Sequence, residues 1–96
     1  MTEQEFRKAL AENGFDEPVL VERKPGTRLD NHMHPFEMMA FIMSGDITLF
    51  TEHSENTYQA GQIFHLQANE LHREAFGPQG VRYLSGRKNS GQTLHS

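Results

Sequence analysis

The sequence predicts an all-β domain, an antiparallel sandwich or barrel, preceded by one short helix. The chain has 96 residues, which is enough for one domain but small for two. From Val19 onward, short apolar segments alternate with turn residues at near-regular spacing. No later segment has helical periodicity, so the sheet must pack on a second sheet or close on itself.

Residues 1–14 are predicted to contain the helix. Thr2 and Glu5 have the spacing of a capping box, and Phe6 and Leu10 fall on one helical face. A helix this short is not stable alone. We therefore expect its apolar face to dock on the domain or on a second copy of the chain.

Residues 19–87 are predicted to form the barrel, within a single domain of residues 1–96. The predicted strands are Val19–Val21, Met38–Met43, Ile47–Thr51, a segment around Tyr58, Ile63–Leu66 and Val81–Leu84. The predicted turns lie at Lys24-Pro25-Gly26, at Ser44-Gly45-Asp46 and around Gly77, Gly80 and Gly86. Residues 88–96 are predicted to be a flexible tail.

Composition excludes several classes of function. A net charge of −4 and a pI near 5.8 argue against a nucleic-acid partner. The absence of cysteine excludes disulfides, thiolate metal sites and a cysteine nucleophile, so any metal has nitrogen and oxygen ligands. The longest apolar run, Met38–Met43, is too short to cross a membrane, and the first eight residues do not form a signal peptide. These features predict a cytoplasmic location and no membrane partner.

A histidine pair is the first candidate for chemistry. His32 and His34 stand two residues apart, so on a strand they point to the same face, with Cα atoms roughly 6.6 Å apart. Two imidazoles at that spacing can reach one ion with bonds of about 2.1 Å. Such a pair also occurs on exposed strands, so its surroundings decide its meaning.

Two glycine-framed blocks surround the histidines. The first, Gly26–Gly45, reads GTRLDNHMHPFEMMAFIMSG, and the second, Gly61–Phe76, reads GQIFHLQANELHREAF. With these blocks the chain resembles the cupin superfamily, as a small single-domain cupin of the conserved-barrel type. Its first motif is Gly, five residues, His-x-His, three or four residues, Glu, six residues, Gly; its second ends in His, three residues, Asn. The resemblance covers roughly Val19–Arg87 and implies a double-stranded β-helix, or jelly-roll, barrel.

The resemblance also implies a metal site. His32 and His34 match its first two ligands and His72 the third. In the second motif, Gln67, Asn69 and Phe76 replace Pro, Gly and Asn, positions that shape a turn and a flank. The implied cofactor is one divalent metal ion. Donor atoms of this kind suit Fe, Mn, Ni, Cu or Zn and do not select among them.

The carboxylate of the first motif is displaced by one residue. Its expected position holds Met38 or Met39, and Glu37 comes one residue early. From His34, position 38 faces the same way and position 37 the opposite way. Glu37 is the predicted fourth ligand if a bulge at Pro35 re-aims it; otherwise Met38 lines a site of three histidines and water.

The other histidines and the methionines have weaker signals. His53 lies in a polar turn and is expected to be solvated, His65 either lines the barrel or is a partly buried structural residue, and His95 has no predicted role. The apolar residues near the histidine pair, whether core filler or the wall of a mostly apolar ligand cavity, are Met33, Met38, Met39, Phe41 and Met43.

Three functions stay open from the sequence. The chain is predicted to be a small metal-binding cupin, either a mononuclear metal-dependent enzyme, dioxygenase-like or related, acting on a small organic molecule, or a non-catalytic ligand-binding or sensing module. In the third reading the metal is only a structural staple. Side chains available for acid–base chemistry or hydrogen bonding are Glu37, His65, Gln67 and Tyr83. A homodimer is expected, since an unpaired strand edge is a liability.

Overall fold

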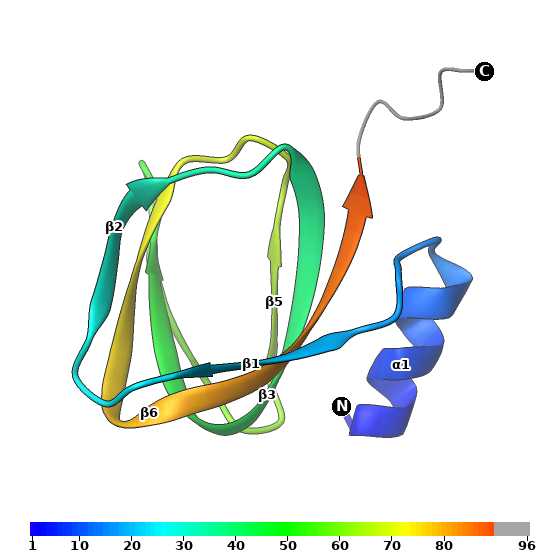
Figure 1. Cartoon of the computed structure of the whole chain (residues 1–96), viewed down its shortest axis with the longest axis horizontal. Coiled ribbons are helices and arrows are strands. Elements are labelled where there is room, and N and C mark those ends of the chain that lie inside the picture. Colours follow the sequence, from blue (N-terminus) through cyan, green and yellow to red (C-terminus); the bar gives the residue numbers. More distant parts are fainter. Residues whose placement is uncertain (90–96) are drawn as a thin grey trace.

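The chain folds into one barrel with a helix on its outside (Figure 1). The structure is a computed structural model and describes residues 1–89. Its elements are α1 (Glu3–Glu12), β1 (Val19–Arg23), β2 (Arg28–His32), β3 (Phe36–Phe50), β4 (Glu55–Gln59), β5 (Ile63–Leu66) and β6 (His72–Asn89). The predicted all-β class with one N-terminal helix is confirmed.

Two long antiparallel strands, β3 and β6, form the central pair of the barrel, and the other strands flank them. They pair from Phe36 opposite Asn89 to Phe50 opposite Arg73. One half of this pair is flanked by β1 and β5, and the other half by β2 and β4. The pair therefore belongs to both walls, which face each other across the interior in Figure 1.

The turn predicted at residues 44–46 is wrong, because β3 continues through it as one strand. The ladder with β6 shifts register between Ile42 and Ser44 and again between Gly45 and Ile47. Gly45 has a φ of 75°, and a Cβ there would lie 2.0 Å from the carbonyl oxygen of Gly80. Glycine lets the strand bulge and bend from one wall to the other without ending.

The glycines predicted to flank a short strand at Val81–Leu84 instead lie inside β6. This strand begins at His72 and ends at Asn89, two residues beyond the predicted barrel. Pairing with β3, β1 and β2 supplies the backbone hydrogen bonds that local turns would have supplied. The predicted tail beyond residue 89 lies outside the described residues.

The helix begins at the predicted capping box. The Glu5 amide donates to Thr2 Oγ1 at 3.1 Å, and the Thr2 amide donates to Glu5 Oε1 at 2.8 Å. Two amides that lack helical partners are thereby satisfied.

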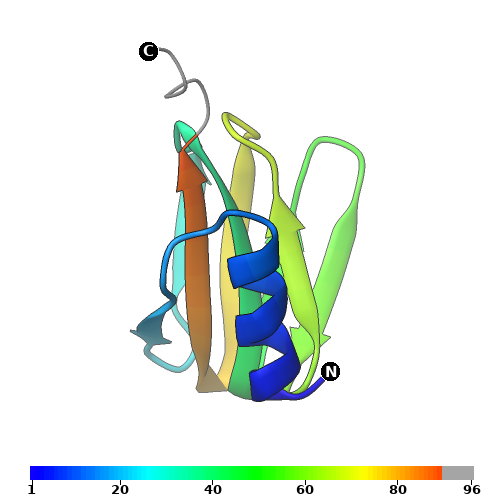
Figure 2. The ribbon, with the colours of Figure 1, turned by 90° about the vertical axis from the view of Figure 1, so that its right-hand side faces the viewer.

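The apolar face of α1 docks on the outer side of one wall of the barrel. Figure 2 shows the helix lying across β6, β3 and β5. Phe6 and Leu10 are fully buried there against Phe41 and Leu84. A Cβ on Gly86 would lie 2.7 Å from Leu10 Cδ1, so this glycine allows the close approach. The predicted docking of the helix on the domain is confirmed.

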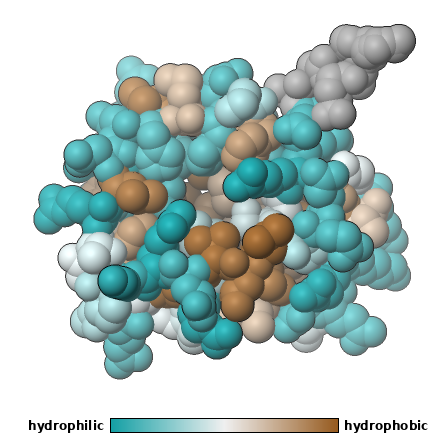
Figure 3. Space-filling model, viewed as in Figure 1, coloured by the Kyte–Doolittle hydropathy of each residue, from teal (hydrophilic) through white to brown (hydrophobic). Residues whose placement is uncertain are grey.

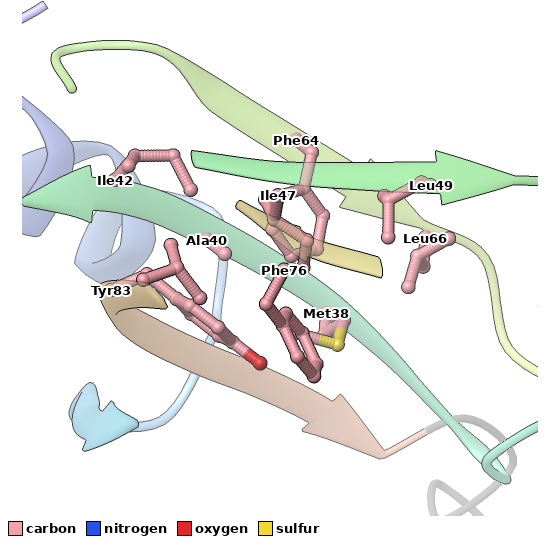
Figure 4. Packing of buried hydrophobic residues seen from close by; sticks show 10 residues of the cluster. Met38, Ala40, Ile42, Ile47, Leu49, Phe64, Leu66, Phe76 and Tyr83 are labelled. Carbon is pink, nitrogen blue, oxygen red and sulfur yellow. The ribbon is translucent and has the colours of Figure 1, made fainter. Parts of the chain in front are cut away.

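Strand alternation separates the interior from this helix-covered surface. Met38, Ala40 and Ile42 face inward, whereas Met39 and Phe41 face α1. Figure 4 shows the inward residues packed together; the buried interior cluster comprises Met38, Ala40, Ile42, Ile47, Leu49, Phe64, Leu66, Phe76, Val81 and Tyr83. Of the methionines near the histidine pair, Met39 and Met43 pack beside α1, Met38 lies in the interior and Met33 is exposed. Within residues 1–89, no helix has the length and apolar character needed to cross a bilayer.

Candidate metal centre

Three histidines meet at one end of the barrel interior. His32 ends β2, His34 lies in the connection to β3, and His72 begins β6, directly opposite His32 in the ladder. One ring nitrogen from each lies within 4.8 Å of the other two. Nitrogens that share an ion through bonds of about 2.1 Å are at most about 4.2 Å apart, so small rotations of the rings would close the group on an ion.

Backbone carbonyls orient two of the three rings. His32 Nδ1 donates to the Asp30 carbonyl at 2.7 Å, and His72 Nδ1 donates to the Glu70 carbonyl at 2.9 Å. Each Nδ1 proton is therefore committed to a carbonyl, which leaves Nε2 as the nitrogen that could coordinate a metal. His34 is positioned differently: its ring stacks on Phe36, with centroids 4.7 Å apart and planes 9° apart.

A carboxylate that the sequence analysis did not select lies in this group. Glu74 Oε2 is 3.1 Å from Nε2 of His32 and 3.1 Å from Nε2 of His72. The residue is only 6% exposed, and its other oxygen, Oε1, is buried with no hydrogen-bond partner among the described residues. A buried oxygen without a donor is expensive, and a cation beside it would satisfy it.

A signal for Glu74 was present in the sequence. It stands two residues after His72, and on a strand that spacing puts both side chains on one face. The signal went unused because the last strand was predicted to begin at Val81, which left residues 72–76 without an assigned parity.

The charges of the group are strongly coupled. Burial alone would lower the pKa of His72, but its hydrogen bonds to Glu74 and to the Glu70 carbonyl raise it above the ordinary value. Burial alone would raise the pKa of Glu74, yet the hydrogen bond from His72 and the charges of His72 and His32 lower it. Burial lowers the pKa of His34, and the neighbouring His72 and His32 lower it further. The group thus favours ionised Glu74 and neutral His34.

The structure does not bring Glu37 to the histidines. Its side chain lies on the outer face of β3 and pairs with His65 Nε2 at 2.5 Å. The strand pairs regularly from Phe36 to Ile42, so no bulge in this part of the strand re-aims the carboxylate, and Met38 takes the inward position beside the cavity. The carboxylate near the three histidines comes from β6 instead.

The remaining histidines are elsewhere. His65 lies on the outside of the barrel, where its side chain is 36% exposed and pairs with Glu37, so it does not line the interior and fits the alternative of a partly buried structural residue. The side chain of His53 is 87% exposed, as expected for a solvated residue. His95 lies outside the described residues.

A cavity of about 240 Å³ opens beside His32, His34 and Glu74. Its remaining lining combines apolar and polar side chains: Val21, Arg23, Leu29, Phe36, Met38, Tyr83, Ser85 and Arg87. Pockets for drug-sized ligands measure roughly 300–1,000 Å³, so this one suits a smaller molecule.

Tyr83 gives the cavity a hydroxyl that stays protonated. Figure 4 shows this hydroxyl directed toward the part of the cluster where Met38 and Phe76 lie. Burial, together with the charge of Glu74, raises the pKa of Tyr83 to about 12. The group is therefore a hydrogen-bond donor at neutral pH and a poor proton acceptor.

Solved structures establish what the barrel resembles. A cupin superfamily protein from Desulfitobacterium hafniense DCB-2 aligns with a TM-score of 0.68 and 12% identity, over 77% of this chain and 67% of that one. The chain has the cupin fold. An RmlC-like cupin from Shewanella frigidimarina NCIMB 400 aligns with a TM-score of 0.66 and 14% identity, over 82% and 70% of the two chains.

A larger protein is also similar in structure. The DMSP lyase DddQ from Ruegeria pomeroyi DSS-3 aligns with a TM-score of 0.70 and 19% identity, over 81% of this chain but 40% of the lyase. No protein-family model and no curated protein matches the sequence. The fold predicted from the two glycine-framed blocks, a double-stranded β-helix of the cupin type, is thus confirmed by structure.

Proposed function

We propose that this cupin holds one divalent metal ion with His32, His34, His72 and Glu74, and that it is a metal-dependent enzyme acting on a small organic molecule. The observation that carries the proposal is the convergence of His32 Nε2, His72 Nε2 and Glu74 Oε2, with both Nδ1 protons already given to carbonyls. In the metal-free protein a proton on Nε2 of His72 is donated to Glu74. Once that proton is released, His32 Nε2, His72 Nε2 and Glu74 Oε2 each offer a lone pair, which suits a cation.

The donor atoms indicate a class of metal ion and do not select one metal. Three imidazoles and one carboxylate suit Fe(II), Mn(II), Ni(II), Cu(II) or Zn(II), in preference to Mg²⁺ or Ca²⁺, which take mainly oxygen ligands. When bound, such an ion supplies Lewis-acid chemistry to oxygen atoms of a ligand. Four protein donors leave room for a ligand on an ion that accepts five or six.

The cavity favours chemistry over a purely structural metal. A structural ion has a closed shell of protein donors, whereas His32, His34 and Glu74 line an open cavity here. Ionised Glu74 can accept a hydrogen bond or a proton at Oε1, its unpartnered oxygen, and Tyr83 can donate a hydrogen bond to a ligand in the same cavity. The similarity to solved DMSP lyases supports an enzymatic use of this barrel.

Metal content tests the first half of the proposal. Protein purified without a tag should contain one equivalent of a transition metal, and His72→Ala and the double variant His32→Ala/His34→Ala should lose it. His53→Ala is the matched control, because that side chain is exposed and does not belong to the cluster. Wild-type metal content in the cluster variants would overturn the site.

Turnover tests the second half. Metal-loaded protein is supplied with small phenols, diketones and carboxylates, and product formation or oxygen uptake is followed. Turnover that His72→Ala abolishes is the expected result. If a molecule shifts the melting temperature but is never converted, the protein is a binding or sensing module and the enzymatic proposal fails.

A further inference from the structure

Two arginines line the same cavity as the histidines. Arg23 ends β1, Arg87 lies near the end of β6, and both border the cavity beside His32 and His34. Among residues 1–89, the ion pairs made by arginine are Arg7 with Glu3 and Arg82 with Glu22. Both cavity arginines thus lack a carboxylate partner within the described part of the chain.

Strand parity aims both arginines at this cavity. On β6, Tyr83, Ser85 and Arg87 occupy alternate positions and all three line it. On β1, Val21 pairs with Tyr83, and Arg23 follows two residues later on the same face. Figure 3 shows the surface hollowed at the centre of the face that carries β1 in Figure 1.

An aromatic ring links one arginine to the histidine cluster. The Arg87 guanidinium lies 4.4 Å from the centroid of the Phe36 ring, which itself stacks on His34. A guanidinium over a ring is held by cation–π attraction while its N–H groups remain free. Arg87 is therefore a positioned donor at the His34 side of the cavity.

The charge of the cavity favours an anion. Two guanidiniums face one ionisable acid, Glu74, and any divalent ion would add to the positive excess. Both arginines also act on the interior, since each lowers the pKa of Tyr83 against the effects of burial and Glu74. The walls between these charges are apolar, formed by Val21, Leu29 and Met38.

We propose that the molecule that enters this cavity is a small organic carboxylate, with its carboxylate bound by Arg23 and Arg87 and its apolar part against Val21, Leu29 and Met38. This inference rests on the proposed function, because the ligand lies between the arginines and the metal group. Planar guanidiniums match carboxylates in shape and charge. Apolar walls disfavour a fully hydrated inorganic anion.

Calorimetric titration of benzoate and benzamide into zinc-loaded protein tests the inference. The two probes have nearly the same shape and differ in charge, so benzoate should bind at least about tenfold more tightly. Arg23→Gln and Arg87→Gln should each weaken benzoate about tenfold without changing benzamide. Arg82→Gln is the control, because it removes an arginine of β6 that is paired with Glu22 away from the cavity.

Each result decides the inference. Equal binding of the two probes to wild-type protein would overturn it, without reliance on any variant. Benzoate binding that survives both cavity substitutions would mean that the metal alone holds the carboxylate. Tighter binding of inorganic phosphate than of benzoate would overturn the carboxylate class.

A zinc titration in the same instrument separates this inference from the proposed function. Failure of zinc to bind would overturn the metal site. Zinc binding of wild-type strength in the arginine variants, together with unchanged benzoate binding, would leave the metal site intact and overturn only the binding of the carboxylate by Arg23 and Arg87.

Discussion

Replacement of Glu74 by glutamine should weaken metal binding while leaving the barrel folded. Glutamine keeps the size and one oxygen of the side chain but removes the charge that lies 3.1 Å from Nε2 of His32 and from Nε2 of His72. Loss of a ligand or of its direct partner usually reduces metal affinity by about 10–100-fold. That range corresponds to about 1.4–2.7 kcal/mol of binding free energy.

Competition between the protein and a chromophoric chelator for Zn(II), at constant pH, measures this change. Glu37→Gln is the matched control, since Glu37 lies on the outer face of β3 and pairs with His65. Its zinc affinity should stay within about twofold of the wild type. The reasoning is refuted if Glu74→Gln binds zinc as tightly as the wild type, or if Glu37→Gln loses as much affinity.

The same substitution should change the pH dependence of the metal-free protein. The lowered pKa of Glu74 gives stability that is present above its ordinary value of 4.5 and is lost as pH falls through the folded value. The raised pKa of His72 gives stability that is present below 6.5 and is lost as pH rises through the folded value. We therefore compare the melting temperatures of the wild type and Glu74→Gln in EDTA. The wild type should have its largest advantage between about pH 4.5 and 6.5. A constant difference across the pH range would contradict this coupling.

Three further substitutions test the docking of the helix, the bulge in β3 and the burial of Tyr83. Leu10→Ala should lower the free energy of unfolding by about 2–5 kcal/mol in urea denaturation, because Leu10 is buried between α1 and the barrel; a loss below about 1 kcal/mol would mean that the helix is not docked. Gly45→Ala should cost about 1–3 kcal/mol for its left-handed backbone, plus the clash with Gly80, and wild-type stability would argue against the bulge. Tyr83 has a pKa of about 12 in the folded protein and an ordinary value of 10.0, so the unfolded chain ionises first as the pH rises. The free energy of unfolding should therefore be unaffected below pH 10 and fall by up to about 2.7 kcal/mol toward pH 12. Tyr83→Phe should remove this part of the alkaline slope in pH-dependent denaturation, and an unchanged slope would contradict it.

Local sequence patterns determined the helix, the strand-rich class and two of the four candidate ligands. The capping residues and the spacing of Phe6 and Leu10 act within one or two helical turns, so the sequence suffices to predict α1. The spacing of His32 and His34 needs only strand parity. His72 required the resemblance of the two glycine-framed blocks to the cupin superfamily, because it lies far along the chain from the pair that it joins in space.

Only the tertiary structure decided how the long strands run and which carboxylate reaches the histidines. Gly45 has the local character of a turn, yet pairing with β6 makes it a bulge, because ladder hydrogen bonds with a distant strand decide the outcome. The same pairing starts β6 at His72 and turns Glu74 inward, while β3 turns Glu37 outward to His65. The choice of carboxylate is therefore a property of the strand register, and register depends on residues far apart in the sequence.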